Sequence, residues 1–545
     1  MLLSRLKQLP LAVICLWTAI FSLSLVLPSA LVDRFASPDE TAVAVSIERL
    51  RETGTAKVSE PLAPTFPWLH PRSYVAVGEA LLPVGFLGWP WWLSQFSRFL
   101  PMSILPVLAS LLAASGVIPW YLLLRRKFGP FAAWWGTALA WTFPPVLLYL
   151  NRSFFTHVPQ LTFAIWALWL LLLSAEKSQP SSRKGIVMRL VAGLLLGIAL
   201  SFRPIEAVWL LPLFYLTHRQ FASLTWQAWI QVVCGTLIGI LPLAFAQAST
   251  YGRWFRVGYW LRSNPDPSAL VPSAAPAAPW YLGIAPYGIH PRAIWWNIRS
   301  FYVSALWPWL IAVVVGCVYS GFIFIRLTSH ALVSNLFKRR LIQLVGQKVA
   351  CLILGFSIGW LLLIYGSGLY TDHIRVGAVT IGNSFLRYTL PFGFIFAWFV
   401  AHFARRVEGL RPSRILFSLM GSLLIVAGIY GAFFHDDESL IQTRREVQRY
   451  TEIHTATRDY FKPGDVILSD RSDKIFFPTF RAVSPLLMTD QLSTFSALTT
   501  STSLGLFSRP LSFGERDAWR RMGYDVRELQ IFGRERLYRL TPFLR

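Results

Sequence analysis

Long apolar stretches recur along this chain and constrain its fold more than any other feature. Between Leu11 and Phe434, runs of about 20 apolar residues alternate with short charged breaks. Mean hydropathy is +0.49 and only 14% of the residues are charged, which excludes a soluble globular domain of ordinary composition. A backbone in lipid must satisfy its own hydrogen bonds, and a helix does so within one segment. We therefore expect an α-helical polytopic membrane protein.

The positions of the charged breaks predict about 11 transmembrane helices. Their approximate bounds are 11–32, 101–124, 130–150, 154–174, 186–202, 205–217, 228–248, 301–325, 349–370, 384–404 and 414–434. Short basic breaks such as Arg125-Arg126-Lys127 then share one side, which the positive-inside tendency makes cytoplasmic. The span 205–217 is short, and the alternative is a re-entrant turn at Arg203-Pro204 that would invert everything downstream.

This arrangement predicts two domains. Residues 1–434 form the membrane-embedded domain, with long outer loops at 33–100 and 249–300, and residues 435–545 form a soluble extracytoplasmic domain. The Trp-rich segment 87–92 in the first loop favours helices that lie in the membrane interface.

The tail carries patterns of both helix and strand. A charged helical segment over 444–460 precedes strand-like residues at 466–468 and 536–540, which predicts a small α/β domain. Residues 436–545 hold 17 Lys and Arg against 15 Asp and Glu, so most of the net charge of +24 belongs to the membrane part. Those basic residues lie at span ends, which indicates membrane lipids rather than nucleic acid as partners. We expect a multi-pass protein of the cell (plasma or inner) membrane.

Two adjacent carboxylates follow the first predicted span. Asp39 and Glu40 stand in Ser37-Pro38-Asp39-Glu40-Thr41, where Pro38 stiffens the backbone at the membrane surface. A carboxylate there can reach a reacting group held at the bilayer boundary. The alternative is a solvated loop in which Asp39 caps a helix that begins at Glu40.

Positive charge also gathers on the predicted outer side, contrary to the positive-inside tendency. Arginine suits a phosphate because its planar fork gives bidentate, charge-assisted hydrogen bonds. The alternative is snorkelling to the phosphates of outer-leaflet lipids. The residues concerned are Arg253, Arg256, Arg262, Arg292 and Arg299 in the second loop, Arg203, Arg375 and Arg387 at outer span ends, and the nearby His70, Arg72, His157 and His290.

Outward carboxylates and outward arginines together favour transfer of a group from a membrane-embedded phosphate ester, and a sugar on a polyprenyl phosphate is the natural donor. The phosphate is already a good leaving group, so cations need only stabilise its growing charge. The acceptor hydroxyl gains nucleophilicity if a carboxylate takes its proton. A single displacement predicts inversion at the anomeric carbon.

At these residues the chain resembles the multi-spanning glycosyltransferases of the GT-C fold, specifically the family 39 protein-mannosyltransferase-like and aminoarabinose-transferase-like group. The resemblance covers nearly all of the membrane part. The matching motifs are Phe35-Ala36-Ser37-Pro38-Asp39-Glu40, His70-Pro71-Arg72, Ser201-Phe202-Arg203-Pro204-Ile205-Glu206, Tyr251-Gly252 with Gly258-Tyr259, His290-Pro291-Arg292 and Val379-Thr380-Ile381-Gly382-Asn383-Ser384-Phe385-Leu386-Arg387-Tyr388.

The resemblance implies that Asp39 is the catalytic carboxylate and Glu40 its close neighbour. It also implies candidates for binding the donor phosphate, namely Arg203, Arg387, Arg72 and Arg292, with His70 and His290 as further candidates. Many members carry an acidic residue between the third and fourth spans, where this chain has Asn151-Arg152 and His157. That departure weakens the case for metal dependence. A divalent metal is compatible with the chemistry, but the sequence identifies no ligand set for one.

These observations predict an inverting glycosyltransferase that moves a sugar from a polyprenyl-phosphate donor to a lipid, glycan or protein acceptor on the outer face of the membrane. The alternative is a transporter or flippase for a lipid-linked sugar, which needs the same arginines but no base. A sugar-chain polymerase or ligase shares the donor and the outward site, and the sequence separates it poorly from a single-sugar transferase.

Overall fold

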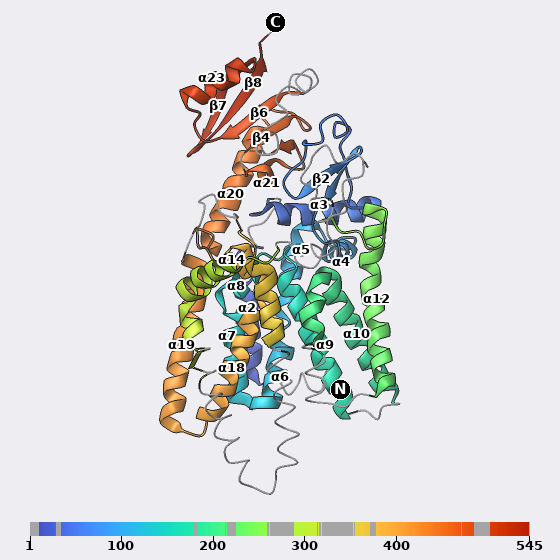
Figure 1. The fold of residues 1–545 in the computed structure, drawn as a ribbon, viewed down its shortest axis with the longest axis vertical. Helices are drawn as coiled ribbons and strands as arrows, with labels where there is room; N and C mark the ends of the chain where they lie inside the picture. The colour runs from blue at the N-terminus through green and yellow to red at the C-terminus, as the bar shows by residue number, and fades with distance from the viewer. Residues whose placement is uncertain are drawn as a thin grey trace. The chain divides into compact units, whose positions relative to one another are not determined.

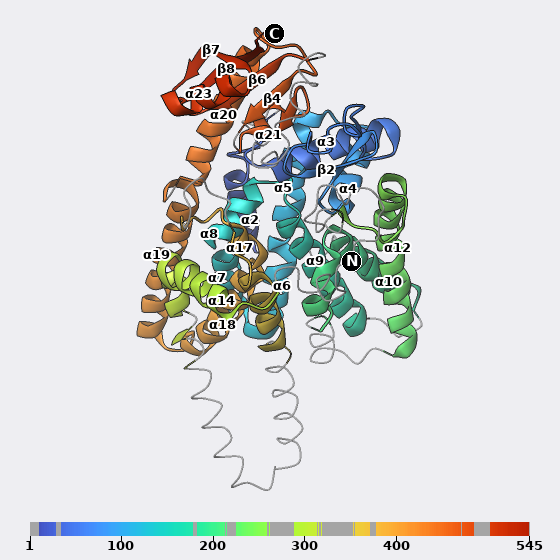
Figure 2. The ribbon, with the colours of Figure 1, turned by 45° about the horizontal axis from the view of Figure 1, so that its top comes forward.

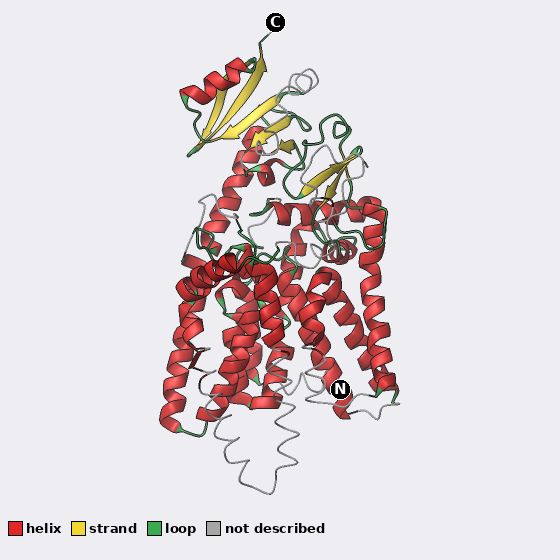
Figure 3. Cartoon of the chain, viewed as in Figure 1, coloured by secondary structure: helices red, strands yellow, loops and turns green. Residues whose placement is uncertain are grey.

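The computed structural model describes residues 10–28, 34–177, 182–212, 214, 225–258, 261, 288–312, 314–315, 318, 353, 355–370, 378–435, 437–469, 471–483 and 502–543. The chain forms two compact units, each built from three separate segments. The first unit comprises Met1–Pro28, Pro106–Leu241 and Pro279–Gln442, and the second comprises Ser29–Leu105, Pro242–Ala278 and Thr443–Arg545. Most described elements are helices, and the strands belong to two small sheets (Figures 1 and 3).

Five helices among the described residues are long and apolar enough to cross a membrane. They are Met102–Phe128, His157–Ala175, Arg183–Phe202, Trp226–Tyr251 and Arg411–Phe434. Shorter apolar helices at Leu11–Leu23 and Gly355–Gly366 also coincide with predicted spans. The prediction of a multi-spanning helical protein is therefore confirmed, whereas the number of 11 spans stays a prediction.

The regular elements described in the first unit are helices. Their bounds are α2 (Leu11–Leu23), α6 (Val117–Phe128), α7 (Pro130–Trp141), α8 (Pro144–Asn151), α9 (His157–Lys177), α10 (Arg183–Phe202), η2 (Pro204–Glu206), α14 (Pro291–Asn297), the π-helix η5 (Ile298–Ala305), α17 (Ser384–Tyr388), α18 (Pro391–Val407) and α19 (Arg411–Phe434). Three helices cross the boundary between the units, namely α5 (Leu105–Ala114), α12 (Trp226–Tyr251) and α20 (Leu440–Thr457).

Prolines interrupt two of the predicted spans. The span predicted at 130–150 is two helices, α7 and α8, and α8 begins at Pro144. The span predicted at 384–404 is likewise divided between α17 and α18, which begins at Pro391. Proline lacks a backbone N–H and fits the first turn of a helix, so the helix restarts there instead of continuing.

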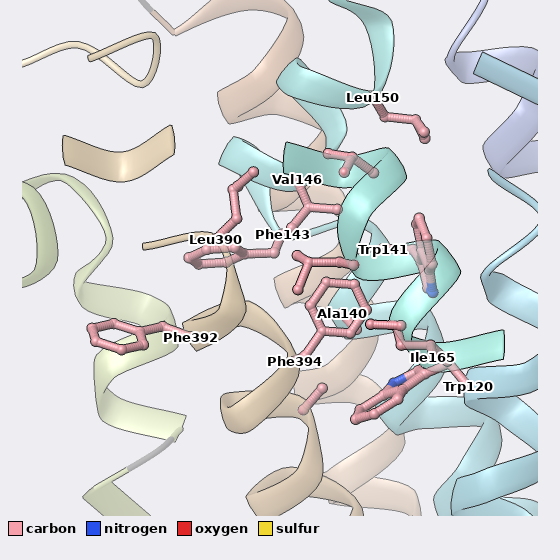
Figure 4. Close-up of a cluster of buried hydrophobic side chains, with 14 of the residues drawn as sticks. Trp120, Ala140, Trp141, Phe143, Val146, Leu150, Ile165, Leu390, Phe392 and Phe394 are labelled. Atoms are coloured by element: carbon pink, nitrogen blue, oxygen red, sulfur yellow. The ribbon is translucent and has the colours of Figure 1, made fainter. Parts of the chain in front are cut away.

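Aromatic and aliphatic side chains from several helices fill the core of the first unit. Trp141 and Trp120 both meet the ring of Phe394 edge to face, with centroids 5.5 and 5.2 Å apart. Figure 4 shows these rings together with Phe143 and Val146. Such pairs add about 0.5–1.5 kcal/mol each to the gain from burial, so they fix how α6, α7 and α18 pack.

Glycines bring α10 and α12 into backbone contact. A Cβ at Gly197 would lie 2.1 Å from the carbonyl oxygen of Thr236, and one at Gly235 would lie 2.2 Å from that of Leu190. The two helices run side by side in both ribbon views (Figures 1 and 2). Small residues allow this close approach, which replaces the hydrophobic driving force that is missing between helices in lipid.

In the second unit, α3 (Pro38–Thr53) and α4 (Gly88–Phe96) flank a small antiparallel sheet. Its order is β1-β3-β2, with β1 at Val58–Ser59, β2 at Tyr74–Val77 and β3 at Ala80–Pro83. The sheet was not predicted, because strands this short carry no recognisable alternation. The helix over the Trp-rich segment is confirmed as α4, and its place in the membrane interface stays a prediction.

The C-terminal segment adds a five-stranded sheet to the second unit, in the order β5-β4-β6-β8-β7. The elements are α20 (Leu440–Thr457), β4 (Val466–Ser469), α21 (Asp473–Phe476), β5 (Arg481–Val483), β6 (Leu504–Ser508), α23 (Phe513–Arg521), β7 (Tyr524–Phe532) and β8 (Glu535–Pro542). The predicted α/β character of this segment and its strands near 466–468 and 536–540 are confirmed. The sheet shares a core with the first loop, where the rings of Tyr74 and Phe477 lie 4.9 Å apart.

Candidate functional site

The beginning of α3 presents the two predicted carboxylates. Ser37 is the N-cap, and its hydroxyl oxygen accepts a hydrogen bond from the N–H of Asp39 (3.2 Å). Pro38 occupies the first helical position, where its fixed φ suits the helix. Asp39 and Glu40 lie in the first turn, where the positive end of the helix dipole stabilises negative charge.

The two carboxylates lie in different environments. Asp39 is exposed, and its Oδ1 accepts a hydrogen bond from the hydroxyl of Ser73 (2.8 Å). Glu40 is only 2% exposed. Successive residues of a helix point about 100° apart, so the turn that exposes one carboxylate buries the next. Asp39 is therefore the carboxylate that a substrate in solution or at a surface can reach.

The segment that supplies Ser73 is tied to α21. The backbone N–H of Arg72 donates to Oδ2 of Asp473 (2.8 Å), and its Nε and Nη2 donate to Oδ1 (2.9 and 2.7 Å). Arg72, which the sequence predicted to bind the donor phosphate, thus forms an ion pair with a carboxylate of its own unit. The other candidate here, His70, donates from Nδ1 to the carbonyl oxygen of Pro71 (3.0 Å).

In the first unit, three buried arginines alternate with aromatic rings. The guanidinium of Arg203 lies 4.9 Å from the ring of Tyr388, and that of Arg387 lies 5.0 Å from the same ring. Arg387 also lies 4.4 Å from the ring of Phe155, which Arg152 approaches to 4.7 Å. We call these five residues the arginine–aromatic ladder. It brings the predicted pair Arg203 and Arg387 together and adds Arg152.

The end of α10 holds Arg203 in place. Its Nε donates to Oε1 of Glu206 (3.0 Å), and its Nη2 donates to the hydroxyl oxygen of Tyr365 (3.1 Å). Tyr365 in turn donates to the same carboxylate (2.6 Å), and Trp209 donates to its Oε2. Because Pro204 ends the helix, Arg203 leaves the helical path with φ −152° and a 3-10 turn places Glu206 beside it.

A local network positions Arg387 as well. Asn383 caps α17 by accepting the N–H of Phe385 (2.9 Å), and Arg387 donates from Nη2 to the hydroxyl of Ser384 (2.8 Å). The hydroxyl of Tyr149 donates to the carbonyl oxygen of Gly382 (2.6 Å), which ties this loop to α8. Residues of the motif at 379–388 thus hold Arg387 in its place in the ladder.

His157, at the start of α9, is the least satisfied polar group near the ladder. Its side chain is 6% exposed, and within the described part of the chain neither ring nitrogen has a hydrogen-bond partner. The ring lies 5.3 Å from that of Tyr388 and interacts electrostatically with the charged groups of Arg203 and Arg387. A buried polar group without a partner is costly, which is typical of a group that binds a ligand.

Besides Arg72 and His70 of the second unit, two predicted candidates in the first unit lie outside the ladder. Arg292 and His290 are exposed at the beginning of α14, where the N–H of His290 donates to the hydroxyl of Ser367 (3.1 Å). Arg152 was noted only as a departure from the family pattern, and His157 was noted among the outer cationic side chains without being named as a site residue. The signal available for them was a polar pair between two long apolar runs. Across the described residues, no group of three or more His, Cys, Asp or Glu side chains could hold a metal ion.

Comparison with known proteins gives a match in structure alone. No protein-family model matches the chain, and no curated protein sequence does. The crystal structure of ArnT from Cupriavidus metallidurans bound to undecaprenyl phosphate is similar with a TM-score of 0.51 and 11% sequence identity, covering 97% of each chain. Its apo structure gives the same TM-score and identity, covering 96% of this chain and 97% of that one.

An archaeal oligosaccharyltransferase from Archaeoglobus fulgidus, in complex with Zn and sulfate, has a TM-score of 0.42 and 13% identity, covering 86% of this chain and 68% of that chain. The similarity to the ArnT structures extends over almost the whole of both chains. The chain is a multi-pass membrane protein with the GT-C fold, as its sequence motifs predicted.

Proposed function

We propose that this chain is an inverting glycosyltransferase that moves a sugar from a polyprenyl-phosphate donor to a lipid, glycan or protein acceptor. We further propose that it acts on the outer face of the cell membrane, with residues 435–545 extracytoplasmic. In this proposal Asp39 is the catalytic base, and Arg203 and Arg387 bind the phosphate of the donor.

The observation that carries the proposal is the arginine–aromatic ladder. Three guanidinium groups, of which that of Arg203 is ion-paired with Glu206, converge on two aromatic rings inside a helical unit. The imidazole of His157 lies beside them, and its nitrogens have no hydrogen-bond partner among the described residues. Buried cations within a membrane protein are costly and mark binding sites. Guanidinium forks bind phosphates, like carboxylates, through bidentate, charge-assisted hydrogen bonds. The ArnT structure that shares this fold was solved with undecaprenyl phosphate bound, which supports a polyprenyl phosphate as the donor carrier.

Asp39 supplies the base that a transferase needs. The acceptor hydroxyl attacks the anomeric carbon while Asp39 takes its proton, and the bond from that carbon to the phosphate oxygen breaks with its electron pair. Polyprenyl phosphate leaves as the anion that the arginines stabilise. The new glycosidic bond forms on the opposite face of the sugar, so the configuration at the anomeric carbon inverts. The exposed Asp39 is suited to this role, whereas the buried Glu40 is its structural neighbour.

The test is sugar transfer by the purified full chain in lipid from a panel of polyprenyl-phosphate sugars. Asp39→Asn should lower kcat by about 100-fold or more, the usual contribution of a general base. Glu48→Gln is the matched control, because Glu48 is an exposed carboxylate on the same helix. If Asp39→Asn kept the native kcat, Asp39 would not be the catalytic base. No transfer from any donor, with lipid-linked sugar crossing vesicles uncleaved, would establish the transporter instead.

A further inference from the structure

Two chain segments support Asp39, and both are held by neighbouring residues of the C-terminal segment. One support is the Ser37 cap at the beginning of α3, and the other is the hydroxyl of Ser73. Asp473 and Lys474, the first two residues of α21, each contact the residue directly before one of these supports, Arg72 and Ala36 respectively. The catalytic carboxylate of the proposed function therefore depends on residues more than 400 positions along the chain.

Asp473 holds the segment that carries Ser73. Its side chain is 0% exposed and accepts three hydrogen bonds from Arg72, one of them from the backbone N–H. The Nη2 of Arg72 also donates to the carbonyl oxygen of Arg471 (2.7 Å). Several charge-assisted hydrogen bonds to one buried carboxylate restrict the positions that the donor residue can take. The residue directly after Arg72 is thus fixed where its hydroxyl meets Asp39.

Lys474 holds the segment that carries the cap. Its ammonium donates to the carbonyl oxygen of Ala36 (2.6 Å), directly before Ser37, and lies 4.8 Å from the ring of Tyr450 on α20. The aromatic ring and the carbonyl together orient a side chain that would otherwise be flexible. The carbonyl of Ala36 is in turn the last peptide oxygen before the N-cap of α3.

We propose that Asp473 and Lys474 are positioning residues that hold the carboxylate of Asp39 in its catalytic orientation. The C-terminal segment is then part of the catalytic apparatus rather than a separate acceptor-binding module. The inference rests on the proposed function for the role of Asp39. We call the contacts of Asp473 with Arg72 and of Lys474 with Ala36 the clamp. These contacts lie within the second unit, where α21, α3 and the first loop share one core.

The experiment replaces Lys474, because Asp473 is fully buried and its loss endangers folding. Lys474→Met removes the ammonium but keeps an apolar stem beside the ring of Tyr450. Lys474→Arg restores the charge. The matched control is the double variant Glu60→Gln with Arg481→Met. It removes another ion pair between the same two segments (2.9 Å), without leaving a buried charge.

Two quantities are measured on folded full-length protein in lipid. The first is the kinetics of transfer, in which Lys474→Met should lower kcat about 10- to 100-fold with the donor KM within about 2-fold. Lys474→Arg should recover most of kcat, and the control pair should stay within about 3-fold of native. The second is hydrogen–deuterium exchange of the peptide over residues 36–41, which should become at least about 3-fold faster only in Lys474→Met.

The two proposals fail in different ways. Native kcat in folded Lys474→Met, or native exchange of the peptide 36–41, overturns the clamp. A loss of kcat in the control pair equal to that in Lys474→Met also overturns it, because the effect would then be general destabilisation. Native kcat in Asp39→Asn overturns the proposed base, and the exchange comparison still decides the clamp.

Discussion

Arg203 and Arg387 share the ring of Tyr388, with their guanidinium groups 4.9 and 5.0 Å from its centre. They come from segments far apart in the sequence, one at the end of α10 and the other on α17. An aromatic face stabilises a cation without neutralising it. The ring therefore holds two guanidinium groups near each other, and that of Arg203 is also ion-paired with Glu206.

Removing this ring should weaken donor binding. Tyr388→Leu eliminates two cation–π contacts and should raise the KM for the polyprenyl-phosphate sugar about 10-fold or more. Tyr388→Phe keeps the ring and loses the hydroxyl that accepts from Arg387 (3.2 Å), so its KM should stay within about 3-fold of native. Steady-state transfer kinetics measure both. Equal effects of the two substitutions would contradict a role for the ring.

We expect His157 to lower the thermal stability of the protein and to raise its affinity for the donor. His157→Phe removes a buried polar group without a hydrogen-bond partner among the described residues, so the melting temperature should be unchanged or raised. Donor affinity should fall about 10-fold, since a hydrogen bond to a charged phosphate is lost. Thermal unfolding in detergent and equilibrium binding of polyprenyl phosphate give the two values.

The control for this substitution is His402→Phe. His402 lies on α18 with its ring 5.7 Å from that of Phe128, outside the ladder. It should leave donor affinity native. A melting temperature that falls sharply in His157→Phe would show that His157 is structural.

The packing of α10 against α12 should not tolerate a larger residue. Gly197→Leu places a side chain where even a Cβ would lie 2.1 Å from the carbonyl oxygen of Thr236. The helices must separate, with a cost of roughly 1–3 kcal/mol in the free energy of unfolding. Gly359→Leu is the control, because nothing lies within 4 Å of a Cβ there. Thermal unfolding of both proteins in detergent should show a lower midpoint for Gly197→Leu alone.

The contact between His454 and Arg34 should make the protein sensitive to acid. Burial, with the nearby charges of Arg34 and Arg458, lowers the pKa of His454 to about 3, and its Nε2 accepts from Nη2 of Arg34 (2.5 Å). Folded His454 stays neutral, whereas in the unfolded chain it takes up a proton below about pH 6.5. This contribution to stability is therefore complete above pH 6.5 and is lost as the pH falls towards 3, with a slope approaching about 1.4 kcal/mol per pH unit.

His454→Gln should consequently show a shallower fall in melting temperature between pH 6.5 and pH 4 than the native chain. His435→Gln is the comparison, since His435 is exposed at the end of α19. The difference between the two variants isolates His454 from the carboxylates that titrate in the same range. Parallel curves for His454→Gln and the native chain would contradict the prediction.

The sequence by itself determined the class of fold and the local shape of the carboxylate turn. Apolar runs long enough to span a bilayer leave only the helix, because no water is present to satisfy the backbone. Ser37-Pro38-Asp39 specifies a cap and a first turn through contacts between neighbouring residues, so the beginning of α3 follows from sequence. The strands of the tail were similarly predictable from runs of β-branched and apolar residues between turns.

Only the tertiary structure decided which charged groups meet. Arg152 joins Arg203 and Arg387 because the rotation and packing of α8, α10 and α17 bring their ends to the same rings. Asp473 reaches Arg72 because two distant segments share one hydrophobic core. Apolar patterns fix which face of a helix is buried, but the partner of that face depends on how all the helices pack at once.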